Sequence, residues 1–186
     1  TNCNWTTAQL FELNFAQKGD TIFVTHRDNP TRRIFRESAT SFTCSAFTFD
    51  ENTAVSNGGV NKSLQPFYKY ADSGITISLS ANSVGTGRTA TASAATFTSN
   101  QVGDYIEINK KQGKITGYTS STVVTIHIIE DMGSTGPHTD WKEQTISAKR
   151  GYPQAVTFHD ARLWLGGVKS RPAALLASQV SIMILM

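Results

Sequence analysis

The feature that most constrains the fold of this chain is a regular series of short, β-branched segments within residues 74–130. Residues 75–79 alternate strictly between apolar and polar side chains, and residues 122–129 carry a strong strand pattern. Such segments recur about every 8 to 12 residues and are separated by turns that contain glycine, which is typical of a small sandwich or barrel. We therefore expect an all-β fold, with a small β-barrel or sandwich in this part of the chain.

Two strand–turn–strand patterns flank this series. The first joins residues 21–25 to residues 32–36 through the turn residues Asp28, Asn29 and Pro30. The second joins residues 151–159 to residues 160–168 and has a similar length and aromatic content. We interpret the two hairpins as one discontinuous β-scaffold that the central domain interrupts. The predicted divisions are residues 1–37 (first scaffold part), 38–73 (connector with short strands), 74–131 (inserted β-domain) and 132–186 (connector and second scaffold part).

Charged residues make up only 17% of the chain, which excludes a disordered acidic or basic polypeptide. The formal net charge of +3 is too small to predict tight non-specific binding to nucleic acid. A basic group near the aromatics Tyr152, Phe158 and Trp164 has two interpretations, a surface that faces a polyanion or another subunit, or a solvated face with salt-bridge partners. We prefer the second. The group comprises Lys142, Lys149, Arg150, Arg162, Lys169 and Arg171.

Two short motifs resemble those of nucleotide-binding enzymes. Residues 26–28 read His-Arg-Asp, as in the catalytic loop of protein kinases, but Arg33 stands where that loop has asparagine. Residues 85–90 match a dinucleotide-binding glycine pattern, yet strand-like residues follow it instead of the helix that must face a pyrophosphate. We interpret the first motif as accidental and the second as a flexible turn.

The four histidines, His26, His127, His138 and His159, lack metal-ligand spacing. We expect His127 to be a half-exposed, hydrogen-bonded residue of a strand. The sequence predicts no catalytic residue, no cofactor-binding residue, no metal site and no cofactor, and hence no enzyme.

Cys3 and Cys44 are too few for a disulfide framework or a zinc site. One bridge between them is possible, but we favour two reduced thiols. The apolar residues 172–186 are too few to cross a bilayer, so we predict no membrane insertion. Because the chain starts at Thr1 without a signal peptide, we interpret it as an internal fragment of a longer polypeptide.

Several segments resemble tail proteins of short-tailed bacteriophages. The resemblance rests on residues 15–26 with Asn29-Pro30 and Arg33-Ile34, and on residues 151–158 with 162–167 and Arg171-Pro172. Between them lie Phe97, Val102-Gly103, Tyr105-Ile106, Gly113, Ile115-Thr116 and residues 122–129, which resemble the small β-domain called FCCH. That domain is named after the first catalytic cysteine half-domain of ubiquitin-activating enzymes, but residues 74–130 contain no cysteine. The chain departs from the tail proteins at residues 180–186, which lack their Ser/Gly/Asp/Phe-rich continuation.

The resemblance implies a virion structural protein of the tail tube or nozzle. Its propeller-like hairpins would form a ring wall through self-association, and an FCCH-like β-barrel would project from that wall. The expected partners are other phage tail proteins and passing DNA, which would be contacted without sequence specificity. Assembly would take place in the bacterial host cytoplasm, and the final location would be the virion.

Two other function classes remain as alternatives. The central domain could bind a host-surface glycan through its aromatics Phe97, Tyr105 and Tyr118. A cell-wall hydrolase would need paired carboxylates or a metal triad, and the sequence provides neither.

Overall fold

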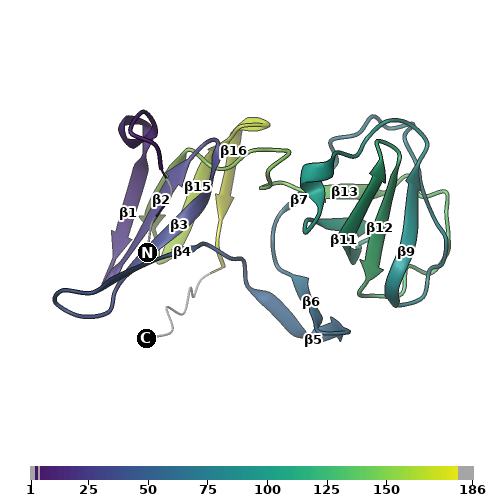
Figure 1. Cartoon of the computed structure of the whole chain (residues 1–186), viewed down its shortest axis with the longest axis horizontal. Helices are drawn as coiled ribbons and strands as arrows, with labels where there is room; N and C mark the ends of the chain where they lie inside the picture. Colours follow the sequence, from purple (N-terminus) through teal and green to yellow (C-terminus); the bar gives the residue numbers. More distant parts are fainter. Residues whose placement is uncertain (1–2, 4, 180–186) are drawn as a thin grey trace. The chain divides into compact units, whose positions relative to one another are not determined.

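The computed structural model describes residue 3 and residues 5–179 (Figure 1). It is all-β, as the sequence predicts, and its described helices are two short 3-10 turns, η1 (Gln9–Glu12) and η2 (Ser99–Gln101). The chain divides into two compact units. The terminal unit combines Thr1–Thr48 with Ile146–Met186, and the central unit is Phe49–Thr145. The apolar ending at residues 180–186 lies outside the described residues.

The first sheet of the terminal unit is a four-stranded antiparallel meander. Its strands follow the chain order β1 (Asn14–Lys18), β2 (Thr21–His26), β3 (Asn29–Arg36) and β4 (Phe42–Ala46). The predicted hairpin is its central pair, β2 and β3. The sequence analysis missed β1 because its side chains are mostly exposed, so no alternation marks it.

The second sheet of the terminal unit contains β14 (Ala155–His159), β15 (Arg162–Val168) and β16 (Arg171–Ala177). Its core face meets that of the first sheet, where Phe23 is buried with Val156, Leu163 and Leu165. The Phe23 ring lies edge-on to that of Phe158, with centroids 5.7 Å apart. The two predicted hairpins, far apart in sequence, therefore share one core.

The central unit is built on a seven-stranded sheet and a separate hairpin. The hairpin pairs β5 (Glu51–Asn57) with β6 (Val60–Ser63). The sheet has the order β7 (Phe67–Tyr68), β13 (Trp141–Gln144), β10 (Tyr105–Ile108), β11 (Lys111–Ser120), β12 (Val123–Ile128), β9 (Gly85–Ala92) and β8 (Ile77–Leu79).

The seven-stranded sheet curls into a barrel-like shape (Figure 1). Its edge strand β8 contacts the segment that precedes β13. Ile77 and His138 form an antiparallel bridge there, with backbone hydrogen bonds of 2.9 and 2.8 Å. The Leu79 amide donates to the Thr135 carbonyl at 2.7 Å. The curled sheet surrounds a core formed by Ile77, Leu79, Ala90, Ala92, Phe97, Ile106, Ile108, Ile115, Val124, Ile126, Ile128, Met132 and Trp141.

The central unit is wider than the inserted domain expected at residues 74–131. Strand β13 pairs with β10 through Ile106 and Glu143, and β7 then pairs with β13. Trp141 is buried, and its indole nitrogen donates to the Ile75 carbonyl at 2.8 Å. Residues on both sides of the predicted boundaries therefore complete the sheet and its core.

The flexible turn predicted at residues 85–90 is wrong. These residues begin β9, which pairs with β12 through Ala90 and Val124. Gly85 and Gly87 have φ angles of +138° and +69°, so glycine permits an irregular start to this strand. Ala90 and Ala92, later in the same strand, are buried in the core of the central unit.

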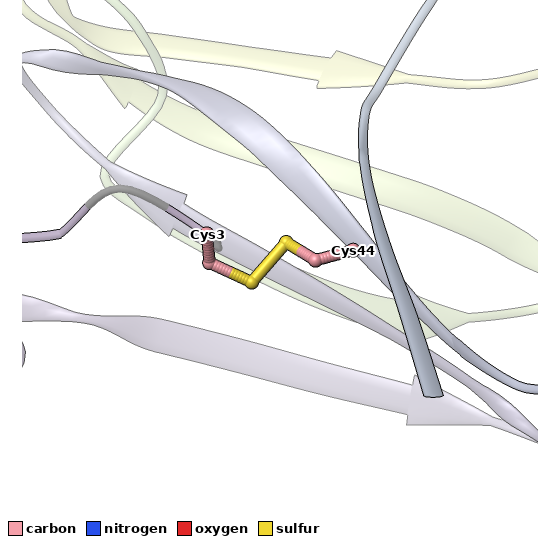
Figure 2. The surroundings of a disulfide bond; sticks show 2 residues. All are labelled: Cys3 and Cys44. Atoms are coloured by element: carbon pink, nitrogen blue, oxygen red, sulfur yellow. A yellow bond between two sulfur atoms is a disulfide. The ribbon is translucent and has the colours of Figure 1, made fainter. Parts of the chain in front are cut away.

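The prediction of two reduced thiols is also wrong, because Cys3 and Cys44 form a disulfide (Figure 2). Their Cα atoms are 5.7 Å apart, within the usual range for a disulfide. Cys44 lies on β4, an edge strand of the first sheet, so the bond attaches the start of the chain to this edge. The approach depends on the whole meander and leaves no signal in the spacing of the two cysteines.

Candidate functional site

Three turns of the terminal unit meet at one end of its sheets. They are the β2–β3 turn, residues 147–151 and the β15–β16 turn. The Tyr152 amide donates to the Arg27 carbonyl at 3.0 Å, and the Ser170 amide donates to the Arg150 carbonyl at 3.0 Å. The turns carry the basic residues Arg27, Lys149, Arg150, Lys169 and Arg171, which we call the basic turn cluster.

A glycine permits the close approach of these turns. Gly151 has a φ of +86°, and a Cβ atom at this position would clash with the Lys169 Cβ. The Gly151 amide also donates to the Ser147 carbonyl at 2.7 Å, which closes the turn of residues 147–151. The backbone of these turns therefore holds the residues of the basic turn cluster in fixed positions relative to one another.

Asp28, in the β2–β3 turn, is an acidic residue that lies beside these basic residues. The Lys169 ammonium lies 2.6 Å from the Asp28 Oδ1, and this hydrogen bond lowers the pKa of the Asp28 carboxyl. Asp28 is therefore ionised at neutral pH and offsets one of the five positive charges.

The basic group that the sequence singled out is divided between the two units. Lys149, Arg150, Lys169 and Arg171 belong to the basic turn cluster. Lys142 lies on β13 of the central unit, where its ammonium is 2.7 Å from Glu107 Oε1. Arg162 is the first residue of β15. It lies about 20 Å from Val168, the last residue of the strand, which adjoins the cluster.

Sequence reasoning missed Arg27 as a member of the cluster. Arg27 belongs to the His-Arg-Asp triplet, which forms the end of β2 and the β2–β3 turn. Its neighbours in the cluster lie more than a hundred residues away in sequence, so local patterns could not reveal them.

His26 and His138 are buried histidines that hydrogen bonds hold in place. The His26 Nδ1 accepts from the Asp28 amide at 3.1 Å, and its Nε2 lies 3.1 Å from Glu12 Oε2. The His138 Nδ1 accepts from the Asn109 side-chain amide at 2.7 Å, while its Nε2 donates to the Ser134 carbonyl at 3.0 Å.

The remaining histidines differ in exposure. His127 hydrogen-bonds through Nε2 to Asn57 Oδ1 at 3.0 Å, as expected of a strand histidine. It is buried, however, and the predicted half-exposure is wrong. His159 is exposed beside Asp160. Within residue 3 and residues 5–179, no group of three His, Cys, Asp or Glu side chains could hold a metal ion.

The aromatic residues considered for glycan binding do not form one exposed platform. Phe97 is in the core of the central unit, packed against Trp141. Tyr105 is buried under the Lys114 ammonium, which lies 5.1 Å from the ring centroid. Burial, together with the nearby Glu51, raises the pKa of the Tyr105 hydroxyl. Of these three aromatics, Tyr118 is exposed.

No protein-family model matches the chain, and no curated protein matches it. Among the helices of the described residues, none has the length and apolar content needed to cross a bilayer. The established result is therefore an all-β fold with two compact units and a basic cluster at one end of the terminal unit.

Proposed function

We propose that this chain is a non-enzymatic structural module of a virion, part of the tail tube or nozzle of a short-tailed bacteriophage. Copies of the full polypeptide would associate into a ring around the channel through which DNA leaves. The observation that carries this proposal is the shared core of β2 and β15, because a scaffold formed by both ends of the chain agrees with a hairpin wall that a second domain interrupts.

Two features of the sheets support a role in assembly. The meanders β1–β4 and β14–β16 resemble the small antiparallel sheets that pack face to face in a propeller. Their edge strands β4 and β16 present backbone groups of the kind that pair or pack across subunits in symmetric rings. The barrel-like central unit would be the projecting domain.

The disulfide also agrees with a virion location. Disulfides persist in oxidising surroundings, and a released virion is exposed to such surroundings outside its host. The Cys3–Cys44 bond would then form or persist after assembly in the bacterial cytoplasm and stabilise the terminal unit in the finished particle.

Electron microscopy of the full polypeptide, and of tail particles that contain it, tests this function. We expect ring-shaped density around an axial channel. Density found only at the tip of a tail fibre, or absent from virions, would rule the proposal out.

Glycan binding by the central unit has less support, because Phe97 and Tyr105 are buried. A glycan array with the whole chain and its Tyr118→Ala variant tests this alternative. Binding that the variant loses would favour glycan recognition over the assembly role.

A further inference from the structure

We infer that the basic turn cluster is a surface for the phosphate groups of nucleic acid and that the terminal unit, not the central unit, provides this contact. The choice of DNA as the polyanion rests on the proposed function. The distribution of charge over the chain does not depend on that function. Binding by the isolated chain and ring formation by the full polypeptide can therefore fail separately.

Charge is unevenly divided between the two units. The terminal unit contains ten Lys and Arg residues against five Asp and Glu residues, a net charge of +5. The central unit contains seven against nine, a net charge of −2. The modest net charge of the whole chain thus conceals a basic unit and a mildly acidic one, and a polyanion is attracted to the former.

Five of the ten Lys and Arg residues of the terminal unit belong to the basic turn cluster. Three of its five cations are arginines, whose planar guanidinium groups match phosphate oxygens with two parallel hydrogen bonds. Arg27 and Lys169 are exposed on adjoining turns, which makes them accessible to a ligand.

The scaffold of the cluster favours phosphate contact over base reading. Backbone hydrogen bonds and Gly151 fix the three turns against one another, so a ligand need not order a mobile tail. The cations of the cluster lie on three separate turns, and Lys and Arg contacts to phosphate oxygens carry no sequence information. We therefore assign the cluster a sequence-independent contact.

Fluorescence anisotropy with a labelled 20-base-pair duplex, titrated with salt, tests this inference on the 186-residue chain. We expect binding at low salt that is equal for two unrelated duplex sequences. The double variant Arg27→Ala/Arg171→Ala should bind more weakly and reduce the slope of log affinity against log salt by about 2, since each phosphate contact contributes about 0.9.

The matched control is Arg33→Ala/Arg36→Ala, which removes the same charge from the same unit. These residues lie about 13 and 23 Å along β3 from Asn29, where the strand leaves the basic turn cluster. The control should leave the salt slope within about 0.5 of the wild-type value. Circular dichroism should show that both variants retain the fold.

Four results would overturn the inference. They are no binding at low salt, an equal loss of slope in the control, a strong preference for one duplex sequence, and binding to the anionic polysaccharide dextran sulfate without binding to DNA. Ring formation with no DNA binding would overturn this inference alone, whereas DNA binding without ring formation would overturn only the proposed function.

Discussion

The two units reach the same fold class by different routes. The central unit is a continuous piece of chain whose curled sheet surrounds thirteen buried side chains among the described residues. The terminal unit joins the two ends of the chain, and its sheets share a smaller buried cluster of Phe23, Val156, Leu163 and Leu165. A disulfide supplements this smaller core.

The two units depend on different interactions for their stability. The central unit has a large buried apolar core, so hydrophobic burial contributes most of its stability. The terminal unit has fewer buried residues, so a covalent cross-link and close contacts between distant turns contribute a greater share of its stability. Substitutions that remove one of these interactions should act on one unit and spare the other.

The largest effect is expected from Trp141→Ala in the central unit. The variant removes a fully buried indole and its hydrogen bond to the Ile75 carbonyl, and should lower the free energy of unfolding by about 3–5 kcal/mol. Hydrogen exchange followed by mass spectrometry should show lost protection in residues 49–145 and unchanged protection in the terminal unit.

Trp164→Ala provides a control of the same size. The Trp164 indole also donates to a backbone carbonyl, that of His159, but its side chain is only half-buried. We expect a loss of about 1 kcal/mol, confined to the terminal unit. Equal loss of protection in both units after Trp141→Ala would show that they unfold as one block and would remove the basis of the comparison.

The second effect is the loss of the disulfide. Cys3→Ser opens a cross-link between residues 41 positions apart and should destabilise the terminal unit by about 2–4 kcal/mol. Denaturant unfolding should show that reductant lowers the wild-type stability to that of the variant and leaves the variant unchanged. A matching loss in the central unit, which contains no cysteine, would contradict this prediction.

The third effect measures how much the close approach of the turns contributes to the stability of the terminal unit. Gly151→Ala places a Cβ against Lys169 and should cost about 1–3 kcal/mol more than backbone strain alone. Gly19→Ala isolates that strain, because Gly19 also has a positive φ but no atom within 4 Å of an added Cβ. Thermal unfolding compares the two variants, and equal midpoints would show that the turns tolerate separation.

The smallest effect is a contrast in pH dependence. Lys169 lowers the pKa of Asp28, so this pair stabilises the terminal unit above the ordinary aspartate pKa of about 3.9, and the contribution is lost as the pH falls through the lowered value. The hydrogen bond from Lys142 to Glu107 raises the pKa of Lys142. That pair stabilises the central unit below about pH 10.4 and is lost as the pH rises through the raised value.

Each pair is solvent-accessible and should contribute less than about 1 kcal/mol. Measurements of unfolding against pH for Asp28→Asn and Lys142→Gln should show that the first variant flattens the acidic limb and the second the alkaline limb. If Asp28→Asn flattened the alkaline limb and Lys142→Gln the acidic limb, the two ion pairs would not have the pH dependence assigned to them here.

Sequence reasoning located the strands whose signals are local. Residues 21–25 and 122–129 carry dense β-branched patterns, and they form β2 and β12. Strand β1 was missed because exposed side chains occupy most of its positions. Residues 85–90 were misassigned because glycines typical of turns occur here at the start of a paired strand.

The candidate site could be predicted only in part. Four members of the basic turn cluster stand out as basic residues in the last third of the chain, but so do Lys142, which belongs to the central unit, and Arg162, which lies at the opposite end of β15 from the cluster. Arg27 joins the cluster through the tertiary structure, in which the Tyr152 amide donates to its carbonyl.

By itself, the sequence determined the fold class, since strand periodicity and turn chemistry act over a few residues. The tertiary structure decided which distant segments share a core, which cysteines bond and which cations gather at one end of the terminal unit. These outcomes depend on contacts between residues far apart in the chain, and their free energy arises only when both partners have folded.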